Sequence, residues 1–330
     1  MLIEHKGQTM ETKLYDESIG EDFCNLMREQ YYAKPSKDKV DNNLKKVATG
    51  GKKLTEIERY YFRDLMAKVK MHHSKWSIEE FIECDDLIKH AFGKIKSNSK
   101  VYDGADIKNL ETYFRLGGKG AAAKPTNFPI STADRILKLY NVNNNYYDYS
   151  CGWGVRMLSA LRNNINYYGT DPNYLLTERL EELHNDYDKA NGVNTFAKIY
   201  TQGSEIFIPE LEGQIGVAFS SPPYFGLEDY RVGEQSFKEG VTYTKWLEGY
   251  FTNTIKNIYN YLVDDGYLIL NINNYAKYKL VEDTTNICEQ NGFKYIITHE
   301  LKNISRIKST KELNTKNNEG IIVFQKVIDK

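Results

Sequence analysis

The sequence contains few cysteines, and they are widely scattered. There are four in 330 residues, and no two of them form a Cys-x-x-Cys pair. This spacing argues against a disulfide framework and against a zinc site built on cysteine. A chain without disulfides is expected in a reducing compartment, so we expect a cytoplasmic protein. The four positions are Cys24, Cys84, Cys151 and Cys288.

Long hydrophobic runs are missing as well. The longest apolar segments, such as 267–270 and 321–324, are far shorter than the roughly 20 residues that a helix needs to span a bilayer. The first ten residues, MLIEHKGQTM, lack the apolar stretch of a secretory signal. We therefore expect no secretory leader and no membrane among the partners.

The chain also has almost no net charge, with 44 Lys and Arg against 45 Asp and Glu. Together with 41% hydrophobic residues, this excludes a polycation and a disordered chain. The exception is 34–75, which holds 12 basic and 5 acidic residues. Such a segment is either a solvated helical surface or a patch that contacts phosphates, and charge alone favours the solvated surface.

The first 105 residues are expected to be mostly helical and to carry no chemical motif. Apolar spacing predicts a helix over 54–69, and Ser77 with Glu80 forms a capping box that starts another. The lysine-rich stretch 34–53 ends in Thr49-Gly50-Gly51 and is typical of a loop or linker. We therefore divide the chain into a helical region, 1–105, that could contact DNA or a partner, and a second domain, 106–330.

From about residue 125 onward, short apolar strands alternate with helical patterns. Repeated strand–helix units predict an α/β fold in which helices cover both faces of a mostly parallel sheet. The last two strands have no clear helix between them and could pair antiparallel at the sheet edge. The expected strands are 146–149, 167–169, 196–200, 215–219, 267–272, 293–298 and 321–325, and the expected helices are 155–161, 175–187, 244–262 and 280–290.

A glycine turn with the sequence DYSCGWG, residues 148–154, joins the first of these strands to a helix. Its glycines let the backbone approach a ligand and point helix N–H groups at it. The second strand ends at Asp171, where nucleoside-binding sheets place an acidic partner for the ribose hydroxyls. The turn lacks the third glycine of a pyrophosphate site, so a dinucleotide is disfavoured. The alternative is a packing turn followed by a helix cap at Asp171.

The most informative stretch is Ser221-Pro222-Pro223-Tyr224, which follows the apolar strand 215–219. The two prolines stop the strand and leave a rigid backbone without N–H donors. In an open α/β sheet, ligands bind at the carboxyl ends of the strands. The Ser221 oxygen, the Pro222 carbonyl and the Tyr224 ring suit a planar amine, whereas an incidental Pro-Pro loop is the alternative.

In this order, the glycine turn, Asp171 and Ser-Pro-Pro-Tyr resemble the S-adenosylmethionine-dependent DNA amino-methyltransferases, which methylate adenine N6 or cytosine N4. The resemblance covers roughly 125–330, and Ser-Pro-Pro-Tyr is its most specific part. It implies a Rossmann-like, mostly parallel seven-stranded sheet, S-adenosyl-L-methionine as cofactor and DNA as partner. It also implies methyl transfer to an exocyclic amine of a base that is flipped out of the duplex.

The resemblance also assigns roles to individual residues. The target amine would be held by Ser221, Pro222, Pro223 and Tyr224, and the ribose by Asp171. The other implied cofactor positions are Phe128 and Pro129, which flank the methionine end; Asp148, Ser150, Cys151, Gly152 and Gly154, which surround the methionine part; Pro172, Ser204 and Glu205, which lie near the adenine; and Ser220.

The sequence departs from the family pattern at two positions. Tyr149 stands where the family often has proline, and Ser204 stands where it often has aspartate. Ser-Pro-Pro-Tyr is commoner with cytosine-N4 specificity, but a cofactor motif ahead of the catalytic one is commoner with adenine-N6 specificity. The target base therefore stays open.

The implied reaction transfers the methyl group directly and needs no covalent enzyme intermediate. Cys151 is therefore not expected to act as a nucleophile. Candidate DNA contacts are 34–75 with its Tyr31-Tyr32 and Tyr60-Tyr61 pairs, the loop 225–240, and the basic stretch 302–316. Each is also compatible with a solvated face. We interpret His72-His73 as surface residues, because adjacent helical residues point apart.

Two other functions remain open at this stage. One is methyl transfer to another planar amine or amide, in RNA or in a glutamine side chain, although the glutamine enzymes usually have asparagine where Ser221 stands. The other is a nucleic-acid-binding module that keeps the fold without catalysis. We find no nuclease-type carboxylate cluster, so any restriction endonuclease partner would be a separate protein.

Overall fold

The computed structural model describes residues 1–97, 107–115, 121–140, 143–236, 240–274, 276–300 and 320–327. Within them the chain forms two compact units. Unit 1 contains 1–36, 55–126 and 226–232, and unit 2 contains 37–54, 127–225 and 233–330. The domain boundary at residue 105 expected from the sequence stays a prediction. Each of the two compact units is built from several segments of the chain.

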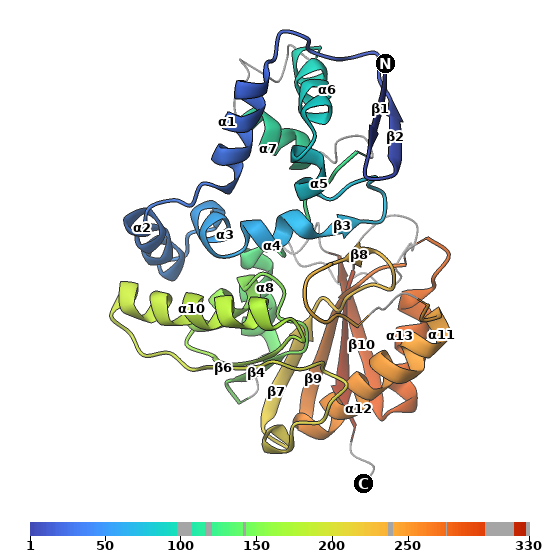
Figure 1. Ribbon diagram of the computed structural model, residues 1–330. Helices are drawn as coiled ribbons and strands as arrows, with labels where there is room; N and C mark the ends of the chain where they lie inside the picture. Colours follow the sequence, from blue (N-terminus) through green and yellow to red (C-terminus); the bar gives the residue numbers. More distant parts are fainter. Residues whose placement is uncertain are drawn as a thin grey trace. The chain divides into compact units, whose positions relative to one another are not determined.

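Unit 2 is built on a seven-stranded sheet with the order β10-β11-β9-β7-β4-β5-β6 (Figure 1). All neighbouring strands pair in parallel except β11, which runs antiparallel to both β9 and β10. This confirms the predicted Rossmann-like, mostly parallel α/β sheet and the antiparallel pairing of the last two strands. The strands are β4 (Asn145–Asp148), β5 (Asn166–Thr170), β6 (Ala197–Tyr200), β7 (Ile215–Ser220), β9 (Leu262–Ile272), β10 (Phe293–Glu300) and β11 (Gly320–Lys326).

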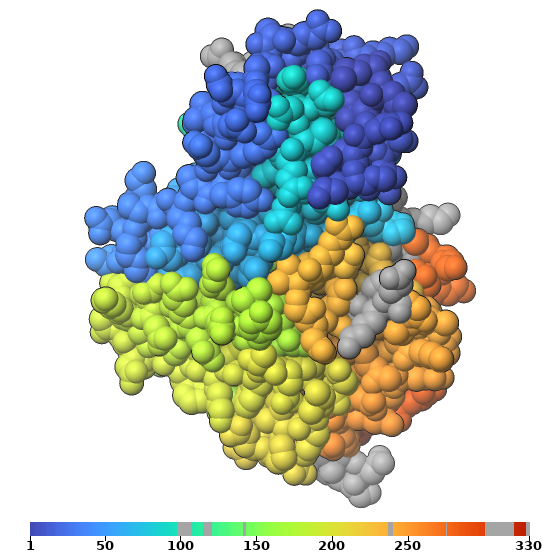
Figure 2. All heavy atoms as spheres, in the orientation of Figure 1, coloured from blue at the N-terminus to red at the C-terminus, as the bar shows by residue number. Residues whose placement is uncertain are grey.

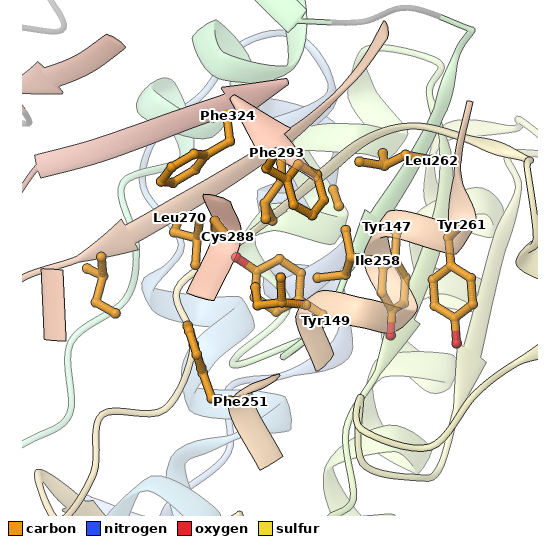
Figure 3. Close-up of a cluster of buried hydrophobic side chains, with 14 of the residues drawn as sticks. Tyr147, Tyr149, Phe251, Ile258, Tyr261, Leu262, Leu270, Cys288, Phe293 and Phe324 are labelled. Atoms are coloured by element: carbon orange, nitrogen blue, oxygen red, sulfur yellow. The ribbon is translucent and has the colours of Figure 1, made fainter. Parts of the chain in front are cut away.

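Alternation along β4 explains how the sheet receives helices on both faces, because successive side chains of a strand point to opposite sides. Tyr146 contacts the rings of Tyr167 and Phe219 on one face. Tyr147 and Tyr149 join the apolar cluster on the other face, against α12 (Thr252–Tyr261) and α13 (Leu280–Gln290) (Figure 3). The buried hydroxyls are satisfied, since Tyr146 donates to the Phe219 carbonyl and Tyr149 donates to the Ile269 carbonyl.

The helices of unit 2 follow the predicted alternation. The helix predicted over 244–262 is continuous but contains a π-helical turn, η3 (Leu247–Phe251), between α11 and α12. In Figure 3, Phe251 and Ile258 lie among the side chains of the buried cluster. The helices are α8 (Ile130–Tyr140), α9 (Val155–Arg162), α10 (Tyr174–Asn191), the 3-10 turn η2 (Pro209–Leu211), α11 (Tyr243–Trp246), α12 (Thr252–Tyr261) and α13 (Leu280–Gln290).

The prediction of a loop or linker over 34–53 is wrong for most of that stretch, because Lys37–Ala48 forms helix α2. Val40, Leu44 and Val47 are fully buried at spacings of four and three residues, which is the stripe of an amphipathic helix. Helix α2 packs on α10 and α9 within unit 2, and Figure 2 shows α2 and α10 side by side. Because lysines surround these apolar positions, the composition of the segment does not reveal the apolar stripe.

Unit 1 has its own core of aromatic and aliphatic side chains, including Trp76, Phe81 and Phe92. It is mainly helical, and Ser77 and Glu80 form the predicted capping box. The sequence reading missed a hairpin whose strands meet at Lys6-Gly7, both with positive φ. The elements are β1 (Leu2–His5), β2 (Gln8–Glu11), α1 (Glu21–Tyr32), α3 (Thr55–Tyr61), α4 (Arg63–Lys68), β3 (Lys70–Met71), α5 (Ile78–Ile82), α6 (Asp85–Lys96), α7 (Ile107–Arg115) and β8 (Glu228–Asp229).

In the described part of the chain, no helix is both long and apolar enough to cross a membrane.

Candidate active site

The three predicted motifs follow neighbouring strands of unit 2. In the sheet, β4 lies between β5 and β7, and all three strands are parallel. Their carboxyl ends therefore meet at one edge, where open α/β sheets bind ligands. The strand order reverses at β4, which makes this edge a topological switch point.

The glycine turn after β4 has the backbone form that glycine favours. Gly152 has a φ of 57° and Gly154 a φ of 73°, both in the left-handed region. Gly154 caps the N-terminus of α9. The Cys151 N–H donates to the Thr170 carbonyl at 3.1 Å, which fixes the turn beside the end of β5.

Asp148 is fully buried, and its carboxylate is held by Arg156, a residue that the sequence reading missed. The Arg156 Nε donates to Asp148 Oδ2 at 3.0 Å, and its Nη2 donates to the Ser150 carbonyl and to Ser220 Oγ. Burial raises the pKa of Asp148, and the Arg156 guanidinium opposes that shift. Asp148 therefore acts on the turn through Arg156, and its Oδ1 is buried without a hydrogen-bond partner among the described residues.

Cys151 lies in the glycine turn, but its surroundings do not favour the nucleophilic thiolate form. Its side chain is 1% exposed, and burial raises the pKa of its thiol well above the usual value. The Sγ packs so tightly on Gly169 that a Cβ added there would lie 2.6 Å from it. Both features agree with the expectation that Cys151 does not act as a nucleophile, since only the thiolate is nucleophilic.

Asp171 follows β5, and the residue as a whole is half-buried. Its Oδ1 accepts from the Asn173 N–H at 3.1 Å, and Asn173 Oδ1 caps α10 through Leu175 and Leu176. Burial raises the pKa of Asp171 to about 7, and the Asn173 N–H opposes the shift. The neighbouring Pro172 is also half-buried.

The segment after β6 holds Ser204 and Glu205 in different surroundings. Ser204 is buried, and its hydroxyl shares a hydrogen bond of 2.9 Å with Thr254 Oγ1 of α12. The Glu205 carboxylate folds over Gly203, where an added Cβ would lie 2.2 Å from Oε2. That Oε2 is buried and has no hydrogen-bond partner among the described residues. Glu205 is therefore the one of the two with unused hydrogen-bonding capacity.

Phe128 and Pro129 precede α8. The Phe128 ring packs edge-on against Phe219 of β7 at 5.5 Å, next to Ser220 in the chain. Pro129 is exposed, and its carbonyl accepts from Thr132 and Ala133 at the start of α8. Phe128 thus lies at the end of β7, whereas the described contacts of Pro129 belong to the helix start.

The Ser-Pro-Pro-Tyr segment begins where β7 ends. Ser220 is fully buried, and its hydroxyl donates to the Ser150 carbonyl at 3.1 Å, joining β7 to the glycine turn. Ser221 and Tyr224 are half-buried, and both hydroxyls point to the carbonyl of Asn271 on β9, at 3.4 and 3.5 Å. Asn271 is a second residue that the sequence reading missed. Its only sequence signal is a polar side chain at the end of an apolar strand.

The structure describes only some of the segments predicted to contact DNA. Tyr31 and Tyr61 are buried in the core of unit 1, so neither tyrosine pair offers two open rings. Residues 226–232 belong to unit 1 and pair through β8 with β3. The stretch 302–316 lies outside the described residues. Nowhere in the described ranges do three or more His, Cys, Asp or Glu side chains form a group that could hold a metal ion.

No protein-family profile and no curated protein sequence matches the chain. Among solved structures, a putative rRNA methylase from Clostridium thermocellum is 11% identical, with a TM-score of 0.42, over 62% of this chain and 100% of the other. The magnesium protoporphyrin IX methyltransferase of Synechocystis PCC 6803, with bound S-adenosylmethionine, is 13% identical, with a TM-score of 0.41, over 71% and 91%. A methyltransferase from Methanosarcina mazei is 15% identical, with a TM-score of 0.39, over 59% and 98%. Similarities of this size carry no conclusion about activity.

Proposed function

We propose that the chain is a methyltransferase that uses S-adenosyl-L-methionine to methylate an exocyclic amine of a base in DNA, at adenine N6 or cytosine N4. One observation carries the proposal. The glycine turn after β4, Asp171 after β5 and Ser221-Pro222-Pro223-Tyr224 after β7 meet at one edge of the sheet. The residues proposed for the cofactor and the residues proposed for the amine are thus neighbours, as direct transfer requires.

The described residues fit the proposed cofactor. The left-handed φ values of Gly152 and Gly154 leave room for close backbone approach. The carboxyl of the half-buried Asp171 suits ribose hydroxyls, and the unpartnered Glu205 Oε2 is a further acceptor. When bound, S-adenosylmethionine supplies an electrophilic methyl group on a positively charged sulfur.

The chain's own residues would then prepare the amine. Its nitrogen is a poor nucleophile because its lone pair is delocalised into the ring. Hydrogen bonds from the amine to Ser221 Oγ and the Pro222 carbonyl favour a more tetrahedral nitrogen, which stabilises the transition state more than the ground state. Holding the amine in line with the methyl group contributes up to roughly 7–11 kcal/mol.

The atoms balance without a covalent enzyme intermediate. The nitrogen lone pair forms the bond to the methyl carbon while the carbon–sulfur electron pair stays on sulfur. The methylated nitrogen then carries a positive charge, and because such a ring-conjugated cation is acidic, it releases one proton to water. Flipping the base out of a duplex costs a few kcal/mol. Stacking on the Tyr224 ring offsets roughly 1–3 kcal/mol of that.

The test is tritium transfer from labelled S-adenosylmethionine to unmethylated, AT-rich duplex DNA, followed by nucleoside mass spectrometry. We expect label in N6-methyladenine or N4-methylcytosine, which also identifies the base. Tyr224→Ala should lose most of the activity and keep cofactor binding, whereas Asp171→Ala should lose cofactor binding. Tyr295→Ala, which changes a tyrosine that is 43% exposed on the edge strand β10, is the matched control and should change neither.

The other outcomes identify the competing functions. Cofactor binding without label in DNA would move the proposal to an RNA or protein amide acceptor. No cofactor binding would leave a non-catalytic nucleic-acid-binding module.

A further inference from the structure

Asn271 brings a polar side chain to the amine site from the strand next to β7. It lies near the end of β9, which pairs with β7 in parallel register, Leu270 opposite Ser220. Its side chain is only 5% exposed. One residue further along each strand, Asn271 therefore stands beside Ser221.

Both the main chain and the side chain of Asn271 contact the Ser221 hydroxyl. Ser221 Oγ donates to the Asn271 carbonyl at 3.4 Å, and Asn271 Nδ2 donates to Ser221 Oγ at 3.3 Å. Both bonds are long, as catalytic hydrogen bonds often are before substrate binds. A serine hydroxyl has one proton and two acceptor lone pairs. Asn271 therefore takes the proton and one lone pair, and it leaves one lone pair for a ligand.

The side-chain oxygen of Asn271 points to a ligand as well. Asn271 Oδ1 is buried and has no hydrogen-bond partner among the described residues. A buried acceptor without a partner costs about 1–3 kcal/mol, so such groups call for an explanation. An amine that docks at Ser221 lies within reach of the same amide group and can satisfy it.

We propose that Asn271 is a positioning residue for methyl transfer, which turns Ser221 into an acceptor toward the target amine. The Asn271 carbonyl draws the Ser221 proton away from the substrate, and Nδ2 fixes the oxygen in place. The remaining lone pair then faces an amine N–H. This inference rests on the proposed function, because it requires an amine substrate at Ser221.

A purely structural role for Asn271 makes a different prediction. A buried asparagine that only stabilises the fold would affect activity whether or not Ser221 has a hydroxyl. If Asn271 acts through Ser221, its effect on kcat disappears once that hydroxyl is removed. Groups in contact show coupling factors of about 2 to 150 in such double-mutant cycles.

The experiment is a cycle of wild type, Asn271→Leu, Ser221→Ala and the double variant, with the unmethylated AT-rich duplex as the acceptor. Leucine keeps the volume and removes both polar atoms. We expect Asn271→Leu to lower kcat about tenfold or more in the wild-type background and less than about twofold in the Ser221→Ala background. The Kd for S-adenosylhomocysteine should stay unchanged in all four proteins.

Asn43→Leu is the matched control, because Asn43 is a buried asparagine of α2 whose amide donates to the Lys53 carbonyl at 2.8 Å. It should lower thermal stability, and any effect on kcat should be the same with and without the Ser221 hydroxyl. Additive effects of Asn271→Leu and Ser221→Ala on an active enzyme would overturn the inference and leave the proposed function standing. A wild-type protein that labels no DNA would instead overturn the proposed function and, with it, this role.

Discussion

The Asp171 carboxyl titrates close to neutral pH, because burial raises its pKa to about 7. Ribose hydroxyls donate hydrogen bonds to the charged form, so ligand binding lowers this pKa and releases a proton. We predict that the affinity for S-adenosylhomocysteine rises about tenfold between pH 6 and pH 8, with about half a proton released near pH 7. Calorimetric titration in buffers of different ionisation enthalpy measures both quantities.

Asp171→Asn should bind weakly at every pH, because the amide does not titrate. Asp264→Asn removes an exposed carboxylate near the start of β9 in unit 2 and should keep the wild-type profile. A wild-type affinity that does not change over this range would rule out the carboxylate of Asp171 as the ribose partner.

Arg156 is the buried cation that balances Asp148, at 3.0 Å. Removing one partner of a buried pair leaves the other charge uncompensated, which costs about 3–5 kcal/mol. We predict that Arg156→Met lowers the free energy of unfolding by this amount in urea titrations. The double variant Asp148→Asn with Arg156→Met should regain much of the stability. It should still bind S-adenosylhomocysteine more weakly than the wild type, because the Ser150 carbonyl has lost one of its two donors and keeps only the Ser220 hydroxyl. Wild-type affinity in the double variant would contradict a role for Arg156 in shaping the turn.

At the scale of single residues, the sequence predicts which residues lie at the edge of the sheet better than it predicts which side chains they contact. Asp148 ends its strand, Asp171 and Ser221 directly follow theirs, and parallel strands bring such positions to one edge of the sheet. The partners Arg156 and Asn271 depend on register and on the direction in which a side chain leaves its element. Composition and spacing do not contain that information, so neither the arginine that holds Asp148 nor the asparagine beside Ser221 was predicted.

At the scale of elements, predictions hold where apolar spacing is strong and fail where polar side chains mask it. The alternation after residue 125 predicts all seven strands of the sheet to within a few residues, apart from an earlier start of β9. The hairpin β1–β2 has only four residues in each strand and was missed. Helix α2 was taken for a linker because eight of its twelve residues are Lys, Asp or Asn, yet its buried stripe packs on α9 and α10 of unit 2.

Adjacent residues of α2 provide the test of that packing. Leu44 is fully buried, whereas Lys45 is exposed. We predict that Leu44→Ala lowers the free energy of unfolding by about 2–5 kcal/mol, since it leaves a cavity against the neighbouring helices. Lys45→Ala should change it by less than about 0.5 kcal/mol. Equal, small effects of the two substitutions in urea titrations would mean that this stretch is a linker after all.

At the scale of the whole molecule, the chain passes between its two units several times, yet each unit has a separate buried core. Every predicted cofactor and catalytic residue lies in unit 2. Units with their own cores can unfold in separate transitions, and a ligand stabilises only the unit that binds it. If the cofactor site lies in unit 2, a bound ligand should therefore raise the stability of unit 2 and leave that of unit 1 unchanged.

We predict two thermal transitions in calorimetry, of which S-adenosylhomocysteine at about 100 times its Kd raises only one. The stabilisation of about 2.7 kcal/mol corresponds to a shift of roughly 5–10 °C for a unit of about 200 residues. Leu44→Ala should lower the transition that the ligand raises, because α2 belongs to unit 2. Phe92→Ala, in the core of unit 1, should lower the other. A single transition that the ligand and both substitutions move together would show that the two units unfold as one, and that cofactor binding reports on the stability of the entire chain.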